Sequence, residues 1–244
     1  EASGYYYWAQ DGLVVDGRLL LFALRTRENP DGAEGFGFVV DGADLLEVPL
    51  GSHGPELGRM TRHRTPLGFR TADGQEETFL CGAVMDMSHR AVGESGDGYV
   101  YVYGTRRAGP RRGLAVGRVL PEDFLAFDRW TFYDGAGWSP AIRDCAVQVA
   151  DMACEFSVTP ILEGLHRGRF LLVYTPGSMG RQVACRLSDA PEGPFGPPVV
   201  LFHTPEPDEG RCIYTYNAKA HPHLSEPGTL LVSYNVNASS WKAH

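Results

Sequence analysis

The feature that most constrains the fold is a pair of apolar runs split by a tight turn, a pattern that recurs along the chain. Its clearest copy has apolar runs at 13–15 and 19–24, separated by Asp16-Gly17. An Asp-Gly pair in this setting predicts a β-hairpin, because the turn needs positive φ and Gly adopts it at little cost. Three further copies turn at Gly98, Gly168 and Gly228.

The turns are roughly 60 to 80 residues apart, and each copy has room for about four short strands. Such a repeat favours an all-β fold of the β-propeller type over a barrel, with an eight-stranded sandwich as the alternative. We expect a single domain over 1–244, with blades near 5–50, 78–135, 152–205 and 212–241. A long connection is expected over 51–75, where Gly, Pro and His are frequent and periodicity is weak.

Composition excludes several partners. A net charge of −8 argues against nucleic acid, which needs basic patches. No apolar run approaches the length of a membrane-spanning helix, so we expect no membrane insertion. The five cysteines form no C-x-x-C pair, and buried unpaired thiols are the simplest interpretation. The chain starts at Glu1 without a signal peptide, and we interpret it as a processed or partial chain.

In a propeller the first strand of each blade lines a central channel, so polar groups on these strands are predicted neighbours. Paired carboxylates with aromatic rings and amides suit glycosidic-bond hydrolysis: one acid protonates the leaving oxygen, while another carboxylate activates water or attacks. The candidate catalytic residues are Glu155, Asp11 and Asp86. The candidate sugar-binding residues are Trp8, Gln10, Tyr216, Asn217 and His221.

Several phrases carry a family resemblance: W-x-x-D-G from Trp8, D-G-x-L-x-x-F from Asp16, E-F-S-V-T-P from Glu155 and Y-N-A-K-A-H-P-x-L-S from Tyr216. They resemble a family of five-bladed propellers from secreted bacterial proteins, whose relatives include endo-D-arabinanases. More distantly the chain is similar to the arabinanase and furanosidase propellers. The resemblance implies a secreted or extracytoplasmic enzyme acting on an arabinan-like polysaccharide or oligosaccharide.

Those propellers hold an aspartate base on the first blade, a second aspartate on a middle blade and a glutamate acid on the fourth. They usually begin with a G-D-G-x-x-S or F-G-D-T phrase, and this chain has neither. If that first blade is missing, four of five blades are covered and Glu155 falls at the position of the acid. His221 then falls where relatives hold a histidine near a channel-bound cation, so a calcium ion could bind there. No other cofactor is implied.

Each candidate also has a plain structural interpretation. Asp11 precedes Gly12 and could be a turn residue. Glu155 could form a salt bridge to Arg25 or Arg186 instead of acting as an acid with a raised pKa. Asp86 could cap a loop, and His221 could be a packed loop histidine. Tyr216 and Asn217 could only satisfy strand ends.

Two functions therefore remain open from the sequence. The first is hydrolysis of a furanose-containing polysaccharide by paired carboxylates. The second is a non-catalytic propeller that binds glycans or proteins at the same channel mouth. An enzyme needs two carboxylates that face each other across an open cleft, and a binding module does not.

Overall fold

The computed structural model describes residues 4–30, 37–109, 112–209 and 212–238. Within these ranges the chain forms four antiparallel sheets and very little helix. The first sheet has the order β1-β2-β3-β4, with β5 also paired to β3. Its strands are β1 (Tyr5–Val15), β2 (Arg18–Glu28), β3 (Phe38–Gly51), β4 (Gly54–Pro55) and β5 (Thr61–Arg64).

The second and third sheets follow in chain order. The second has the order β11-β10-β9-β8-β7-β6 and the third β12-β13-β14-β15. The second contains β6 (Gly68–Arg70), β7 (Glu76–Asp86), β8 (Val100–Ala108), β9 (Arg112–Val119), β10 (Thr131–Tyr133) and β11 (Trp138–Ser139). The third contains β12 (Phe156–Pro160), β13 (Phe170–Tyr174), β14 (Gln182–Ser188) and β15 (Val199–His203).

The fourth sheet pairs β16 (Ile213–Ala220) with β17 (Val232–Ala238). The helical segments are one turn each. They are α1 (His89–Val92) and the 3₁₀ turns η1 (Leu57–Arg59), η2 (Gly93–Ser95), η3 (Pro121–Asp123), η4 (Phe127–Arg129), η5 (Ile142–Asp144), η6 (Glu206–Asp208) and η7 (Pro222–Leu224). In the described part of the chain, no helix is long and apolar enough to cross a membrane.

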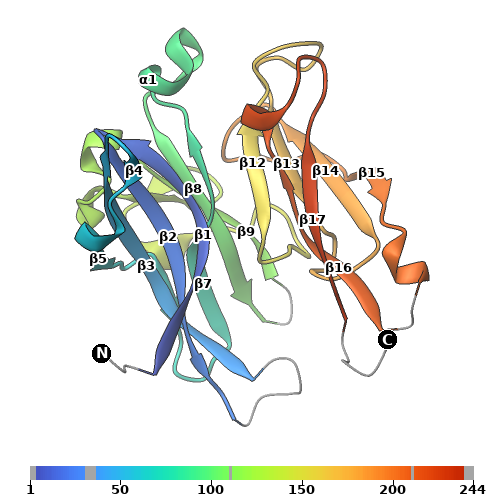
Figure 1. Ribbon diagram of the computed structural model, residues 1–244, viewed down its shortest axis with the longest axis horizontal. Coiled ribbons are helices and arrows are strands. Elements are labelled where there is room, and N and C mark those ends of the chain that lie inside the picture. Colours follow the sequence, from blue (N-terminus) through green and yellow to red (C-terminus); the bar gives the residue numbers. More distant parts are fainter. Residues whose placement is uncertain (1–3, 31–36, 110–111, 210–211, 239–244) are drawn as a thin grey trace.

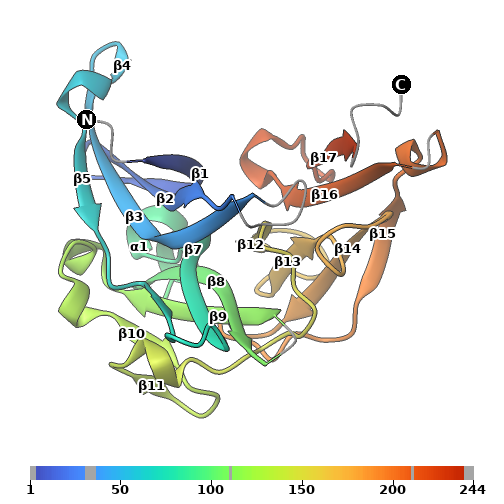
Figure 2. The same cartoon turned by 90° about the horizontal axis from the view of Figure 1, so that it is seen from below.

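The four sheets surround a common centre (Figures 1 and 2). Strand β1 lies beside β7, β7 beside β12, and β12 beside β16, so the first long strand of each sheet is also its innermost. This is the arrangement of blades in a β-propeller. The fold class predicted from the recurring hairpin is confirmed, and the sandwich alternative is wrong.

Apolar side chains fill the spaces between neighbouring sheets. Phe22, Leu45 and Leu80 belong to the cluster between the first and second sheets. Tyr103 and Phe156 belong to the cluster between the second and third. A smaller cluster joins the third and fourth sheets, with Val173, Cys185 and Ala218. Blade packing therefore comes from residues far apart in sequence, which holds the innermost strands in place.

Two strand predictions need correction. The segment 51–75 is not a plain connection, because it contains β4, β5 and β6. These strands have two to four residues, too short for a period of two to be visible in the sequence. The apolar runs at 36–40 and 44–50 also predict two separate strands, but the structure has one strand, β3, whose ladder with β2 shifts register between Arg25 and Thr26. Residue 36 lies outside the described ranges.

Candidate functional site

The innermost strands all run in one direction, which defines two ends of the propeller. Figure 1 shows the connections from β7 to β8, β12 to β13 and β16 to β17 at the top. The β1–β2 turn lies at this end too, because Asp16 in that turn accepts a hydrogen bond of 2.8 Å from Arg90 in α1. We call this end of the propeller the far end. The opposite end, where the innermost strands begin, is called the starting end.

Three of the innermost strands lose register with their partners near mid-strand. In β1 the ladder breaks between Ala9 and Gly12, in β7 between Leu80 and Ala83, and in β16 between Tyr216 and Lys219. Each break leaves two residues outside the ladder, as in a β-bulge. Strand β12 begins at the same level, directly after Cys154 and Glu155. The bulge pairs are therefore Gln10-Asp11, Cys81-Gly82 and Asn217-Ala218, and Cys154-Glu155 completes the set.

Contacts between blades show which of these pairs lie close together. A Cβ added to Gly82 would stand 3.2 Å from the Phe156 ring and 3.3 Å from the Cys154 carbonyl oxygen. The electrostatic environment of Cys81 includes Cys154 and Lys219, which come from the third and fourth sheets. The bulge of β7 therefore meets the start of β12, and Lys219 of β16 lies within electrostatic range of it.

Asp11 connects two blades. Its Oδ1 accepts a hydrogen bond of 2.9 Å from the Gly12 amide, and its Oδ2 accepts one of 2.8 Å from the Val84 amide on β7. The first bond matches the turn-residue interpretation, and the second was not expected. Both oxygens therefore have structural partners, so any catalytic role for Asp11 has to use their remaining lone pairs.

Glu155 is half-buried at the start of β12. Burial raises the pKa of its carboxyl above the usual 4.5, and the positive charges of Lys219 and Arg112 oppose this only in part. The predicted salt-bridge partners are wrong. Arg25 pairs with Asp44 in its own sheet, and Arg186 donates to the Tyr174 hydroxyl oxygen and the Gly196 carbonyl. A carboxyl with a raised pKa stays protonated at a higher pH than usual, so it can deliver a proton to a leaving group.

Aromatic and amide side chains lie toward the starting end. The Trp8 ring is 38% exposed and meets the Phe38 ring edge-on, with centroids 4.5 Å apart. Gln10 lines a cavity described below. On β16, the Tyr216 ring lies 5.7 Å from that of Tyr214. These rings suit the apolar faces of sugars.

Asn217 has two unusual properties at its bulge. Its backbone is left-handed, with φ of 56°, and its buried Oδ1 has no hydrogen-bond partner among the described residues. A strained residue and an unpaired buried acceptor each cost free energy, and both are concentrated at functional sites. The interpretation that Asn217 only satisfies a strand end does not fit, because its side-chain oxygen remains unsatisfied.

Asp86 and His221 lie elsewhere. Asp86 ends β7 at the far end, where its Oδ1 accepts a hydrogen bond of 2.8 Å from the Ser88 amide. His221 follows β16 at the same end, and its Nε2 lies 2.7 Å from the Ser233 hydroxyl. The structure does not bring these two residues to the level of Glu155. Among the described residues there is also no cluster of three or more His, Cys, Asp or Glu side chains, so we assign no residues to the predicted calcium ion.

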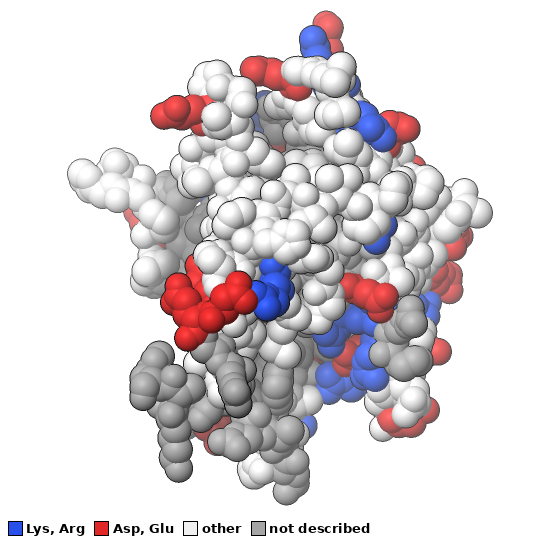
Figure 3. Space-filling model, turned by 90° about the vertical axis from the view of Figure 1, so that its right-hand side faces the viewer, with Lys and Arg blue, Asp and Glu red and all other residues white. Residues whose placement is uncertain are grey.

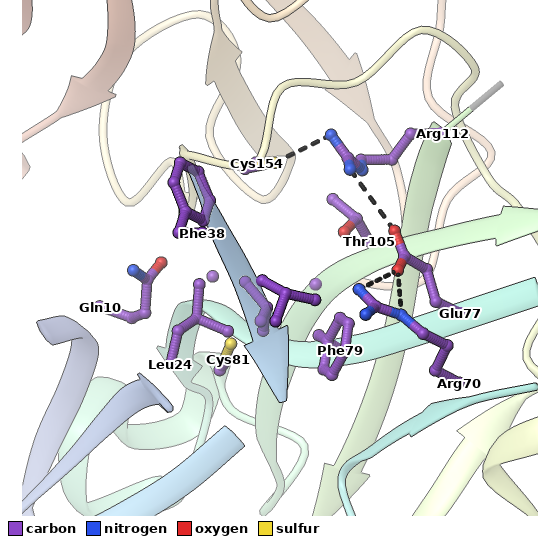
Figure 4. A pocket seen from close by; sticks show the side chains of 14 residues that line it. Gln10, Leu24, Phe38, Arg70, Glu77, Phe79, Cys81, Thr105, Arg112 and Cys154 are labelled. Atoms are coloured by element: carbon purple, nitrogen blue, oxygen red, sulfur yellow. Dashed lines mark hydrogen bonds and ion pairs between the residues drawn. The ribbon is translucent and has the colours of Figure 1, made fainter. Parts of the chain in front are cut away.

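A cavity of about 180 Å³ opens beside these bulges, at the starting end. Figure 4 shows Gln10, Leu24 and Phe38 on one side of it, and Arg70, Glu77 and Arg112 on the other. Cys81 and Cys154 also line it. Burial raises the pKa of the Cys81 thiol to about 12 and raises that of Cys154 as well, so neither thiol is poised as a nucleophile.

Sequence reasoning missed Arg112, Glu77 and Cys154 as neighbours of the predicted site. Arg112 Nη1 lies 3.0 Å from the Cys154 sulfur, and its Nη2 lies 3.5 Å from Glu77 Oε1. Lys219, within the Y-N-A-K-A-H phrase of the fourth repeat, is a further neighbour that the sequence does not single out. The sequence pattern that could have indicated these residues is the alternation of charged and apolar residues at the ends of the predicted strands. That pattern does not reveal which blades contact each other.

Comparisons with known proteins agree with this fold. The sequence model of a family described as "Domain of unknown function (DUF5005)" matches residues 1–244. A crystal structure from Bacteroides ovatus, of a protein proposed to be a hydrolase, is similar with a TM-score of 0.64 and 19% identity, over 98% of this chain and 56% of that one. The chain thus spans little more than half of that protein. No curated protein sequence is detectably similar.

Two further solved structures match more weakly. One is a bifunctional GH43-CE protein from Bacteroides eggerthii, with a TM-score of 0.36 and 11% identity, over 96% of this chain and 27% of that one. The other is a GH43_1 enzyme from Xanthomonas citri complexed with xylose, with a TM-score of 0.33 and 13% identity, over 96% of this chain and 82% of that one. Similarity at this level carries no argument about the present site.

Proposed function

Because the chain belongs over its whole length to the DUF5005 family, whose function is not assigned, we propose a function from the geometry of its own site. The protein hydrolyses glycosidic bonds of a furanose-containing, arabinan-like polysaccharide outside the cytoplasm, and Glu155 is the general acid. The observation that carries this proposal is the position of Glu155. It is a half-buried carboxyl with a raised pKa in the electrostatic field of Lys219 and Arg112, and it directly follows Cys154, which lines the cavity.

The surroundings of Glu155 support this role in two ways. The raised pKa keeps the carboxyl protonated at a pH where an ordinary glutamate is ionised, as a general acid requires. Trp8 and Tyr216 offer ring faces, while Gln10 and Asn217 offer amides that can bind sugar hydroxyls. In this proposal Asp11 is the second carboxylate of the chain, as base or nucleophile.

The test is release of reducing sugar from a panel of arabinans and related furanosides. Glu155→Gln keeps the shape of the side chain but cannot donate the proton, so its rate should fall by about 10²- to 10⁴-fold. In the parent, the rate should fall as the pH rises through the raised pKa of Glu155, because the acid form is then lost.

Glu163→Gln is the matched control, because Glu163 is an exposed carboxylate in the far-end loop between β12 and β13. It should leave the rate unchanged. Equal activity in the parent and Glu155→Gln would remove Glu155 from the mechanism.

A non-catalytic glycan-binding module is the second candidate, and the bonds of Asp11 favour it. Both oxygens of Asp11 already accept hydrogen bonds from backbone amides. Among the described residues, Glu155 is then the one candidate carboxyl at this level that accepts no hydrogen bond from another residue. Sugar binding without hydrolysis by parent and Glu155→Gln alike would support this module over the enzyme.

A further inference from the structure

One row of cross-strand neighbours in the second sheet carries an unusual series of charges. Arg70 on β6 pairs with Glu77 on β7, Glu77 with Arg107 on β8, and Arg107 with Arg112 on β9. Like charges directly opposite each other in a sheet destabilise it. The Arg107–Arg112 pair is therefore unfavourable unless an anion lies between or beside the two guanidinium groups.

Glu77 is the anion that the chain supplies. Its side chain is 9% exposed, and it accepts from Arg70 at 2.7 Å and from Arg107 at 3.1 Å, while Arg112 lies at 3.5 Å. Burial raises the pKa of Glu77, but the hydrogen bonds from Arg107 and Arg70 outweigh it, so the pKa is lowered and the carboxylate is charged. One negative charge thus serves three guanidinium groups.

The cluster keeps donors available for a ligand. Arg70 uses Nε and Nη2 on Glu77, and Arg112 uses Nη2 on Glu77 and Nη1 on Cys154. Among the described residues, Arg70 Nη1 and Arg112 Nε have no acceptor. Arg70 and Arg112 line the cavity, whereas Arg107, which is about equally exposed, does not.

The other cavity walls suit a sugar ring. Phe38 and Phe79 provide aromatic surface, while Thr105 and Gln10 provide polar groups (Figure 4). The volume of about 180 Å³ is below the range of pockets that enclose drug-sized ligands. A cavity of this size matches one sugar unit or its charged substituent better than several units.

We propose that this cavity binds one anionic sugar unit, charged by a carboxylate or a phosphate ester, between the guanidinium groups of Arg70 and Arg112. This inference rests on the proposed function, since it assigns an acidic unit to the glycan that Glu155 would cleave. Guanidinium groups recognise both kinds of anion through paired, charge-assisted hydrogen bonds. The net charge of the chain is −8, so attraction of polyanions by the whole molecule does not account for such binding.

The experiment measures binding by titration calorimetry to the Glu155→Gln variant, which separates binding from hydrolysis. The probes are trigalacturonate, the same oligosaccharide with its carboxyl groups reduced to alcohols, and arabinose 5-phosphate. The charged probes should bind about 10- to 100-fold more tightly than the reduced one, and less tightly as salt is added. The tighter of the two charged probes identifies the source of the charge.

Arg112→Gln should remove this preference, and Arg107→Gln is the matched control because it alters the same Glu77 cluster from outside the cavity. If Arg112→Gln does not fold, the comparison of charged and reduced probes and its salt dependence decide the question. Equal binding of charged and reduced probes, or an Arg107→Gln variant as impaired as Arg112→Gln, would overturn the inference. Hydrolysis of a neutral arabinan without binding of charged probes would overturn it and keep the proposed function.

Discussion

At the scale of single residues, Glu77 and Glu155 at the starting end have pKa values shifted in opposite directions. Burial dominates at Glu155 and raises its pKa, whereas hydrogen bonds from two arginines dominate at Glu77 and lower its pKa. For Glu155 the sequence left open two interpretations, a salt bridge and an acid with a raised pKa. It did not predict Glu77, because the three arginines that surround it lie on different strands, and strand register cannot be read from composition.

Glu77→Gln should lower the free energy of unfolding at neutral pH by about 3 kcal/mol, since it leaves three clustered guanidinium groups without their anion. The pKa of Glu77 is lower in the folded state than the usual 4.5, so its contribution is present above that pH and is lost as the pH falls through the folded-state value. Denaturant unfolding of parent and variant across this pH range should show a difference that shrinks in acid.

The neighbouring carboxylate provides the control for this prediction. Glu76 has a side chain that is 48% exposed and lies 3.6 Å from Arg106. Because exposed ion pairs contribute little, Glu76→Gln should change the free energy of unfolding by less than about 0.5 kcal/mol. Comparable losses in both variants would show that the Glu77 cluster is no more than a solvated surface pair.

At the scale of secondary-structure elements, the hairpins were the most predictable part of the chain. The predicted turn glycines Gly17, Gly98, Gly168 and Gly228 all have positive φ, as the Asp-Gly argument requires. The bulges were not predicted, because Gln10-Asp11 and Cys81-Gly82 share no sequence pattern. What they share is a level in the channel, and only the pairing of strands reveals it.

The bulge of β7 depends on a glycine on the partner strand. A Cβ at Gly104 would stand 1.8 Å from the Phe79 carbonyl oxygen, a backbone atom that cannot move without displacing the strand. We expect Gly104→Ala to lower the free energy of unfolding by about 3 kcal/mol or more. Thermal unfolding followed by circular dichroism would measure this.

Gly58 is the matched control, since nothing lies within 4 Å of an added Cβ there. Gly58→Ala should leave the melting temperature nearly unchanged. If Gly104→Ala has the same melting temperature as the parent, the second sheet adapts to the extra methyl group. The close approach of β7 and β8 is then not required.

At the scale of the whole molecule, the propeller class and its low helix content were predictable from the recurring hairpin. The outer strands were less so. Strand β15, at the edge of the third sheet, leaves Val199, Val200, Leu201 and Phe202 between 42% and 57% exposed. Figure 3 shows a wide uncharged area on the face formed by the third and fourth sheets. An apolar edge strand can pair with another chain, so this face favours self-association.

Leu201 is the residue to change, because it stands at the register shift between Val183 and Ala184 and has no ladder partner of its own. Leu201→Lys should reduce association at high protein concentration without loss of stability, as followed by sedimentation velocity. Leu224→Lys places the same charge at an exposed leucine in η7, outside any strand, and should have no effect. Equal association of parent and Leu201→Lys would show that the edge of β15 is not the contact.

The bulges described above also have a consequence for how such a protein can change over generations. Residues outside the ladder contribute side chains to the channel but few of the bonds that hold strands together. If the channel binds sugar as proposed, its preference can therefore change at Gln10 while blade pairing is maintained by the residues on either side. A saturation library at Gln10 can be scored separately for folding and for sugar binding. It should tolerate many amino acids in the folding assay and few in the binding assay.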